Sequence, residues 1–186
     1  TYLNSLDVRT IGVAGGSMIR VENGEIKDVG PRSAHIAGLG YEVFSPALPE
    51  PKLSLLAPCA EDEAAYAVIT GADGAKAALT LAGAANLLGK VPEGDYASGD
   101  REAARIAWQA LGDTIGCSAQ AAAEKAMKIA AGKIRGITED LIRDYELSPA
   151  TLCLAGGGGS AGAVVPYLGD AMGCSWKVVR NAPIIS

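Results

Sequence analysis

The sequence predicts an α/β fold with a mixed sheet, β-hairpins and packed helices. An Asn-Gly turn signal stands near its start, and apolar residues recur at the helical period in its middle. A strand, a glycine-rich turn, a helix and a further strand then follow one another near its end. Hydrophobic residues make up 49% of the 186 residues, enough to fill a sizeable core, so we expect a single domain over residues 1–186, either compact or made of two small lobes.

The first predicted element is a β-hairpin between residues 9 and 29, with a type I′ turn at Asn23-Gly24. A strand over residues 10–13 is expected to run into the bend Gly15-Gly16-Ser17 and to leave it as the next strand. Consecutive glycine amides can bind an anion, but a tight hairpin without a ligand explains the same pattern equally well.

Residues 30–58 contain five of the nine prolines and are predicted to be an irregular crossing segment. A second hairpin is expected to follow, with strands at 66–69 and 78–81 on either side of the glycine-containing turn 71–74.

Two helices are predicted in the middle of the chain. Asp100 and Ser118 are expected to cap them, because a short polar side chain at this position accepts hydrogen bonds from the first free amides of a helix. The second helix is the longer one, since apolar residues continue at helical spacing as far as Ile142.

The last third predicts a parallel α/β unit. A strand at 151–155 is followed by a glycine-rich turn at 156–160, a helix at 161–172 and a strand at 176–179. We expect the strands to be buried on both faces. A helix N-terminus after a glycine turn suits a phosphate or the edge of a nucleotide, although no Gly-Lys-Ser/Thr sequence of a P-loop follows.

Composition excludes several classes of protein. The net charge of −5 argues against a nucleic-acid partner. No apolar stretch approaches the roughly 18 residues of a membrane helix, so no membrane partner is expected. A lone histidine, His35, cannot build a histidine-based zinc cluster. The four cysteines form no CxxC pair and predict buried free thiols in a reducing, cytoplasmic setting.

Three polar features have more than one interpretation. Arg32 is a candidate partner for either a carboxylate or a phosphate. His35 is interpreted as a structural loop residue rather than a site residue. The acidic run Glu61-Asp62-Glu63 is more typical of a solvated hairpin entrance than of a metal site.

Two segments carry a resemblance to a known family. Residues 7–17 read D-V-R-T-I-G-V-A-G-G-S and residues 29–34 read V-G-P-R-S-A. They resemble the motifs D-x-x-T-I-G-x-G-G-G-S and V-G-P-x-S-A-G of the large subunit in the hydantoinase/oxoprolinase family. Segments 85–90 and 181–186 are similar to that family as well. The resemblance implies the C-terminal lobe of an actin-like ATPase domain, which has a ribonuclease H-like fold.

The resemblance also implies a site and cofactors. Asp7 would be the catalytic residue, and ATP with Mg²⁺ or another divalent metal would be the cofactor. The phosphates would lie at Gly15, Gly16 and Ser17. The residues that would border the adenosine are Gly157, Gly158 and Gly159. The ligands of the metal stay unknown.

The implied reaction is the ATP-dependent hydrolysis of a small cyclic amide of the 5-oxoproline or hydantoin type. The alternatives are a non-catalytic assembly module of the same fold, or an ATP-dependent ketone carboxylase or kinase relative. Thr1 in place of Met suggests a fragment of a longer chain, inactive by itself. The implied partners are the missing N-terminal lobe of the same chain, a second subunit and, through an exposed apolar face, a further copy of this chain.

Departures from the family pattern imply a divergent branch. Ala14 replaces the first glycine of the turn, and Ala84 stands where the family has an aspartate. The run His35-Ile36-Ala37-Gly38 replaces the family's G-A-x-P-G-P.

Overall fold

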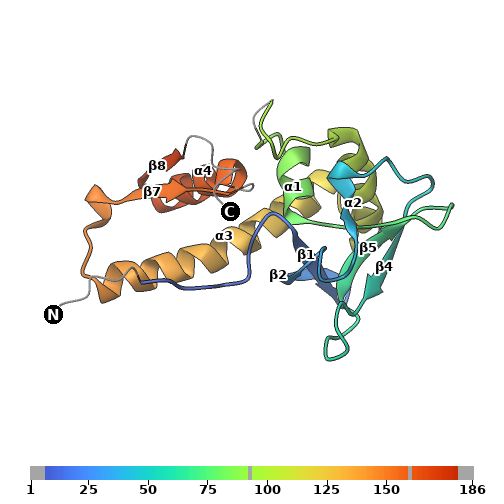
Figure 1. Ribbon diagram of the computed structural model, residues 1–186, viewed down its shortest axis with the longest axis horizontal. Helices are drawn as coiled ribbons and strands as arrows, with labels where there is room; N and C mark the ends of the chain where they lie inside the picture. Colours follow the sequence, from blue (N-terminus) through green and yellow to red (C-terminus); the bar gives the residue numbers. More distant parts are fainter. Residues whose placement is uncertain (1–6, 92–93, 159–160, 180–186) are drawn as a thin grey trace.

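The computed structural model describes residues 7–91, 94–158 and 161–179, and in it a long helix links a larger sheet to a smaller one (Figure 1). The larger sheet lies at one end of the molecule with helices α1 (Leu81–Leu87) and α2 (Arg101–Ile115). Helix α3 (Ala119–Asp144) runs from there towards the smaller sheet, which helix α4 (Ala161–Met172) accompanies.

The larger sheet has six strands and is mixed, as predicted. Its order is β2-β1-β5-β6-β3, with β4 paired to β5. Strands β3 and β6 are parallel, whereas the other pairings within this sheet are antiparallel. The strands are β1 (Ser17–Glu22), β2 (Glu25–Ser33), β3 (Gly40–Tyr41), β4 (Lys52–Leu56), β5 (Tyr66–Thr70) and β6 (Lys76–Ala78).

The first hairpin is confirmed at its turn but not at its entrance. Glu22 pairs with Glu25 across Asn23 and Gly24, whose φ angles of 53° and 74° are those of a type I′ turn. The strand predicted over residues 10–13 does not form. Gly12 has a φ of 63°, which ends any extended run, so the glycine turn precedes β1 instead of joining two strands.

The prediction of an irregular segment over 30–58 is wrong in three places, one of which is the short strand β3. Strand β2 continues to Ser33, and β4 pairs with β5 along its whole length, from Lys52 opposite Thr70 to Leu56 opposite Tyr66. The prolines on both sides of β4 led to this wrong prediction. A proline breaks a strand only where the amide hydrogen that it lacks would have to donate to a neighbouring strand.

The second hairpin forms between β5 and β6 but ends earlier than predicted. Thr80 caps helix α1, and its hydroxyl accepts a hydrogen bond from the Gly83 amide at 3.3 Å. Leu81, expected on the return strand, is therefore the first residue of a helix. A short 3₁₀ helix, η1 (Glu42–Phe44), lies between β3 and β4.

Both predicted helix caps are confirmed. The Asp100 carboxylate accepts hydrogen bonds from the amides of Glu102 at 2.8 Å and Ala103 at 3.0 Å. The Ser118 hydroxyl accepts one from the Ala121 amide at 3.1 Å. Each side chain thus satisfies amides that the first turn of a helix leaves free.

Replacing Asp100 by alanine is expected to lower the free energy of unfolding by about 1 kcal/mol, the usual cost of losing an N-cap. Asp100→Asn keeps an acceptor oxygen and should cost much less. Asp113→Ala, which removes an exposed carboxylate from the same helix without touching the cap, is the matched control. Urea unfolding followed by circular dichroism measures all three, and equal losses for Asp100→Ala and Asp113→Ala would contradict the capping role.

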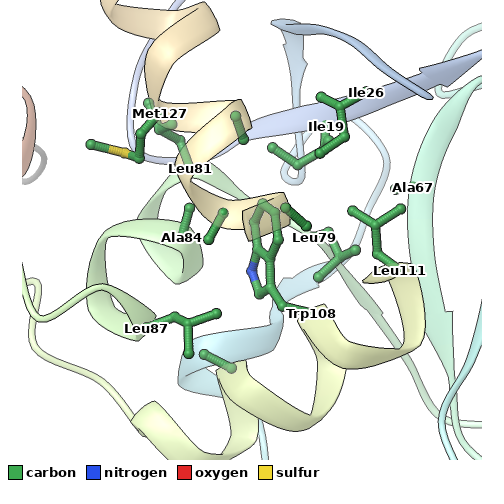
Figure 2. Close-up of a cluster of buried hydrophobic side chains, with 14 of the residues drawn as sticks. Ile19, Ile26, Ala67, Leu79, Leu81, Ala84, Leu87, Trp108, Leu111 and Met127 are labelled. Atoms are coloured by element: carbon green, nitrogen blue, oxygen red, sulfur yellow. The ribbon is translucent and has the colours of Figure 1, made fainter. Parts of the chain in front are cut away.

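The core gathers where α1, α2 and α3 meet the larger sheet (Figure 2). Trp108 of α2 is fully buried at its centre, among Leu79, Leu81 and Leu111. Alanines on α3 let this helix approach closely, since Ala122, Ala123 and Ala126 are fully buried as well. A large indole surrounded by small and aliphatic side chains therefore fills this core.

The C-terminal unit is parallel, as predicted, but its strands are not buried on both faces. Strands β7 (Cys153–Gly156) and β8 (Ser175–Val178) pair in parallel and form the smaller sheet. Helix α4 packs against it, with Gly169 in contact with Trp176. Three consecutive residues of β8 are exposed, and because neighbouring side chains of a strand point to opposite faces, β8 is exposed on both faces.

The cysteine prediction is half right. All four cysteines are free, but none is buried: Cys153 is exposed and the other three are partly exposed. None of the described helices is both long and apolar enough to cross a membrane.

Candidate functional site

The turn before β1 is closed by its own side chain. The Ser17 hydroxyl accepts a hydrogen bond from the Ala14 amide at 2.9 Å and donates one to the Gly12 carbonyl at 3.3 Å. The Ser17 amide also donates to the Ala14 carbonyl at 3.0 Å. Ser17 is only 3% exposed, so its buried side chain stabilises the turn from within the protein.

The two glycines of this turn keep free donors. Among the described residues, the amides of Gly15 and Gly16 have no acceptor, while their carbonyls accept from the amides of Ala82 and Ala34. Adjacent amides without acceptors are suited to bind an anionic oxygen.

A pocket of about 470 Å³ opens at this turn, and the two glycine-rich segments of the chain meet there. Gly15 and Gly16 line it from one end of the sequence, and Gly157 and Gly158, just after β7, line it from the other. The remaining wall is largely apolar and includes Tyr41, Phe44 and Tyr96. No charged side chain belongs to this lining among the residues that the structure describes.

Tyr41 lies directly over the glycine turn. A Cβ atom on Gly16 would collide with the Tyr41 hydroxyl, so a larger residue at this position would have to displace the Tyr41 side chain. The Tyr41 ring lies between those of His35 and Phe44, with centroid distances of 5.3 and 5.7 Å. The three rings form an aromatic row, of which Tyr41 and Phe44 reach the pocket.

The residue after Tyr41 is a buried acid. The Glu42 carboxylate accepts hydrogen bonds from the Thr80 amide at 3.2 Å, the Thr80 hydroxyl at 2.9 Å and the Trp108 indole nitrogen at 2.9 Å. Burial raises the pKa of Glu42 from its ordinary 4.5 to about 7, although these hydrogen bonds oppose the rise.

Sequence reasoning missed Glu42 and Tyr41. The available signal was a single acid between apolar neighbours, in the run Tyr41-Glu42-Val43-Phe44. Such an acid is normally exposed, and only the partners that the fold brings to it, Thr80 and Trp108, make its burial tolerable.

The structure brings together four of the residues expected at the nucleotide: Gly15, Gly16, Gly157 and Gly158. Ser17 is adjacent but faces into its own turn. Gly159 lies outside the described residues.

Asp7 lies elsewhere. Its carboxylate accepts hydrogen bonds from Arg9 at 3.2 Å and from the Tyr145 hydroxyl at 3.1 Å, and Arg9 also pairs with Asp144 at 2.7 Å. These contacts place Asp7 at the C-terminal end of α3, along which the N-terminal segment runs (Figure 1). Asp7 is not part of the pocket lining.

The other polar candidates are engaged within the fold. Arg32 forms a forked pair with Asp62, with distances of 2.9 to 3.1 Å, and also contacts Glu61. The hydrogen bond from Arg32 lowers the pKa of Asp62. In the described ranges, His, Cys, Asp and Glu side chains form no group of three that could hold a metal ion.

The fold and the pocket together define a mixed α/β protein with a curled sheet, packed helices and a glycine-lined open site. The hydantoinase/oxoprolinase family matches residues 1–186, and the chain belongs to this family. No curated protein sequence matches it.

A solved structure has the same fold. It is the nucleotide-free structure of an acetone carboxylase, an enzyme of ATP-dependent acetone carboxylation. The TM-score is 0.58 at 22% sequence identity, and the match covers 93% of this chain. The chain spans only 21% of that larger chain.

Proposed function

We propose that this chain is the ATP-binding lobe of a hydantoinase/oxoprolinase-type enzyme that hydrolyses a cyclic amide of the 5-oxoproline or hydantoin type. The observation that carries the proposal is the pocket shared by Gly15 and Gly16 with Gly157 and Gly158. Glycines at both walls let a ligand approach the backbone closely, which suits a nucleotide held by amides.

The residues of the pocket fit a nucleotide phosphate. The amides of Gly15 and Gly16 lack acceptors among the described residues and would donate to phosphate oxygens. Helix α4 begins three residues after Gly158, and its amide-rich N-terminus favours negative charge nearby. The side chains of Tyr41, Phe44 and Tyr96 would give the bound ligand apolar contacts.

Bound ATP would supply the phosphoryl group that turns the amide oxygen into a better leaving group. The chain's own contribution is to hold the phosphates by fixed amides that need no rearrangement as charge develops. Among the described residues the pocket lining holds no carboxylate, so these residues do not fit Mg²⁺ as direct ligands. In this proposal Mg²⁺ would therefore be bound through the phosphates of ATP and not directly by these residues.

Asp7 stays the proposed catalytic residue. In the structure its carboxylate is held by Arg9 and Tyr145, so acting at the pocket would require the N-terminal segment to leave the end of α3. Asp7→Ala in the full-length protein is the direct test. ATP-dependent turnover equal to the wild type would remove Asp7 from the proposal.

The rest of the proposal concerns the whole protein. Because the chain spans 21% of the acetone carboxylase chain, we infer a further lobe that completes the ATP site, and a second subunit or copy as a partner. A cytoplasmic location is a separate part of the proposal and rests on the free cysteines. ATP-dependent ketone carboxylation is the second candidate, favoured by the fold shared with acetone carboxylase. A non-catalytic assembly module is the third.

Calorimetric titration of the full-length protein with a non-hydrolysable ATP analogue and Mg²⁺ tests the pocket. Gly16→Ala is expected to weaken binding at least tenfold, because the added Cβ displaces the Tyr41 side chain. Gly132→Ala is the matched control, since a Cβ there meets no neighbour, and it should bind like the wild type.

Absence of analogue binding to the wild type would overturn the nucleotide proposal. ATP consumption measured with 5-oxoproline, with hydantoin, and with acetone plus bicarbonate then separates the candidate reactions. Nucleotide binding without turnover of any of the three would favour the assembly module.

A further inference from the structure

We propose that Tyr41 is a ligand-contacting residue whose hydroxyl donates a hydrogen bond to a phosphate oxygen at the glycine turn, and that Glu42 is the residue that positions it. The inference rests on the proposed nucleotide function and adds a side-chain donor to the backbone amides. It is carried by two observations: where the Tyr41 hydroxyl stands, and how Glu42 is anchored.

The Tyr41 hydroxyl is placed as a donor without an acceptor. It stands against Gly16 at the pocket, and none of the hydrogen bonds found among the described residues involves it. The half-buried ring lies between His35 and Phe44. Burial, with the Glu42 charge beside it, raises the pKa of Tyr41, so the hydroxyl keeps its proton at neutral pH and can donate it.

A phosphate oxygen is the acceptor that this arrangement suits. Tyr41, Gly15 and Gly16 all line the pocket, and the Tyr41 hydroxyl stands against Gly16. The hydroxyl and the free amides of the two glycines are all able to donate. Convergent donors without a matching acceptor select a ligand atom that accepts several hydrogen bonds. The adenine and ribose rings do not need such a set.

Glu42 is anchored from two helices. Thr80 at the start of α1 gives it two hydrogen bonds, and Trp108 of α2 gives it a third. A Cβ on Gly83 would collide with the carboxylate, so α1 leaves room for Glu42 because this position is glycine. No charged group of the described chain bonds to Glu42, so this side chain acts as an anchor and not as half of an ion pair.

The anchor acts on Tyr41 through one peptide bond. Tyr41 pairs with Ala78 of β6 on one side, and Glu42 is tied to Thr80, two residues further along the same segment. The main chain of Tyr41 is thereby held at both ends, which limits where its hydroxyl can stand relative to Gly16. Loss of the Glu42 anchor frees one of these ends.

Tyr41→Phe in the full-length protein tests the contact. Its affinity for the Mg²⁺ complex of a non-hydrolysable ATP analogue is expected to fall about tenfold or more, as for loss of a hydrogen bond to a charged group. Its affinity for adenosine, which has no phosphate, should not change. Tyr66→Phe, which removes a hydroxyl outside the pocket lining, is the matched control and should bind both ligands like the wild type.

A double-mutant cycle tests the positioning role of Glu42. Glu42→Ala is expected to weaken analogue binding when Tyr41 is present. In the Tyr41→Phe background it should cause no further loss of affinity, because Glu42 acts through the same hydroxyl. Glu42→Gln keeps an acceptor for Thr80 and Trp108 and should restore most of the affinity. Trp108→Phe, which removes the indole donor and most nearly keeps its volume, replaces Glu42→Ala if that variant fails to fold.

The outcomes separate this inference from the proposed function. No analogue binding by the wild type overturns the proposed function. Binding by the wild type and equally by Tyr41→Phe overturns the Tyr41 contact, and an equal loss for adenosine and analogue overturns its assignment to phosphate. Additive losses in the cycle overturn the positioning role of Glu42.

Discussion

Trp108→Ala is expected to lower the free energy of unfolding by about 3–5 kcal/mol, the range for deletion of a buried aromatic side chain. Trp108 is 0% exposed and packs at the junction of α1, α2, α3 and the sheet (Figure 2). Its indole nitrogen also donates to Glu42 at 2.9 Å, so the variant leaves both a cavity and a buried carboxylate with one donor fewer.

Urea unfolding of the wild type, Trp108→Ala and Trp108→Phe measures this loss of stability and separates the contribution of the cavity from that of the hydrogen bond. The phenylalanine variant removes the donor while filling much of the cavity, so its loss reports mainly the hydrogen bond. Trp176→Ala is the matched control, because Trp176 is 42% exposed on β8 and should cost clearly less. A loss at Trp108 no larger than that at Trp176 would mean that the core does not depend on this residue.

Stability is expected to fall as the pH rises from 4.5 to 7, because Glu42 holds its proton more tightly in the folded protein than in the unfolded chain. Its folded pKa is about 7 against an ordinary 4.5. The folded state therefore gains a stabilising contribution below pH 4.5 that is lost as the pH rises through 7. A displacement of this size corresponds to about 3 kcal/mol.

Comparison with Glu42→Gln isolates this contribution. Arginine partners lower the pKa values of Asp62 and Asp144, so these groups lose stabilisation at acid pH, in the opposite direction, but they are common to both proteins and cancel. The free energies of unfolding of the two proteins should diverge by about 3 kcal/mol between pH 4.5 and 8, in favour of the glutamine variant. A difference that stays constant with pH would contradict an ionising Glu42 in the core.

The parts of the fold predicted correctly depend on contacts within a few residues. Asn23-Gly24 adopts left-handed angles that favour these two residue types, and the carboxylate of Asp100 reaches amides two and three residues ahead. Ser118 acts in the same way. Because such signals are complete within a short window, the sequence suffices to predict them.

The errors concern elements whose stability comes from distant partners. Strand β4 exists because β5 offers it a full set of pairing positions, although the prolines of the segment predict an irregular structure. The strands of the smaller sheet have the apolar pattern of buried strands, yet their exposure depends on which elements cover them. Neither partner is encoded in the local pattern.

By itself, the sequence determined the α/β class, the caps, the first hairpin turn and the resemblance to the hydantoinase/oxoprolinase family, to which the chain belongs. Only the tertiary structure decided the site. It brought Gly16 and Gly158, which are distant in the sequence, into one pocket, and it placed Asp7 at the C-terminal end of α3, outside that pocket. It also buried Glu42 beside Tyr41. The physical reason is that a pocket forms where separate elements pack together, and their packing depends on surfaces that no short segment of the chain contains.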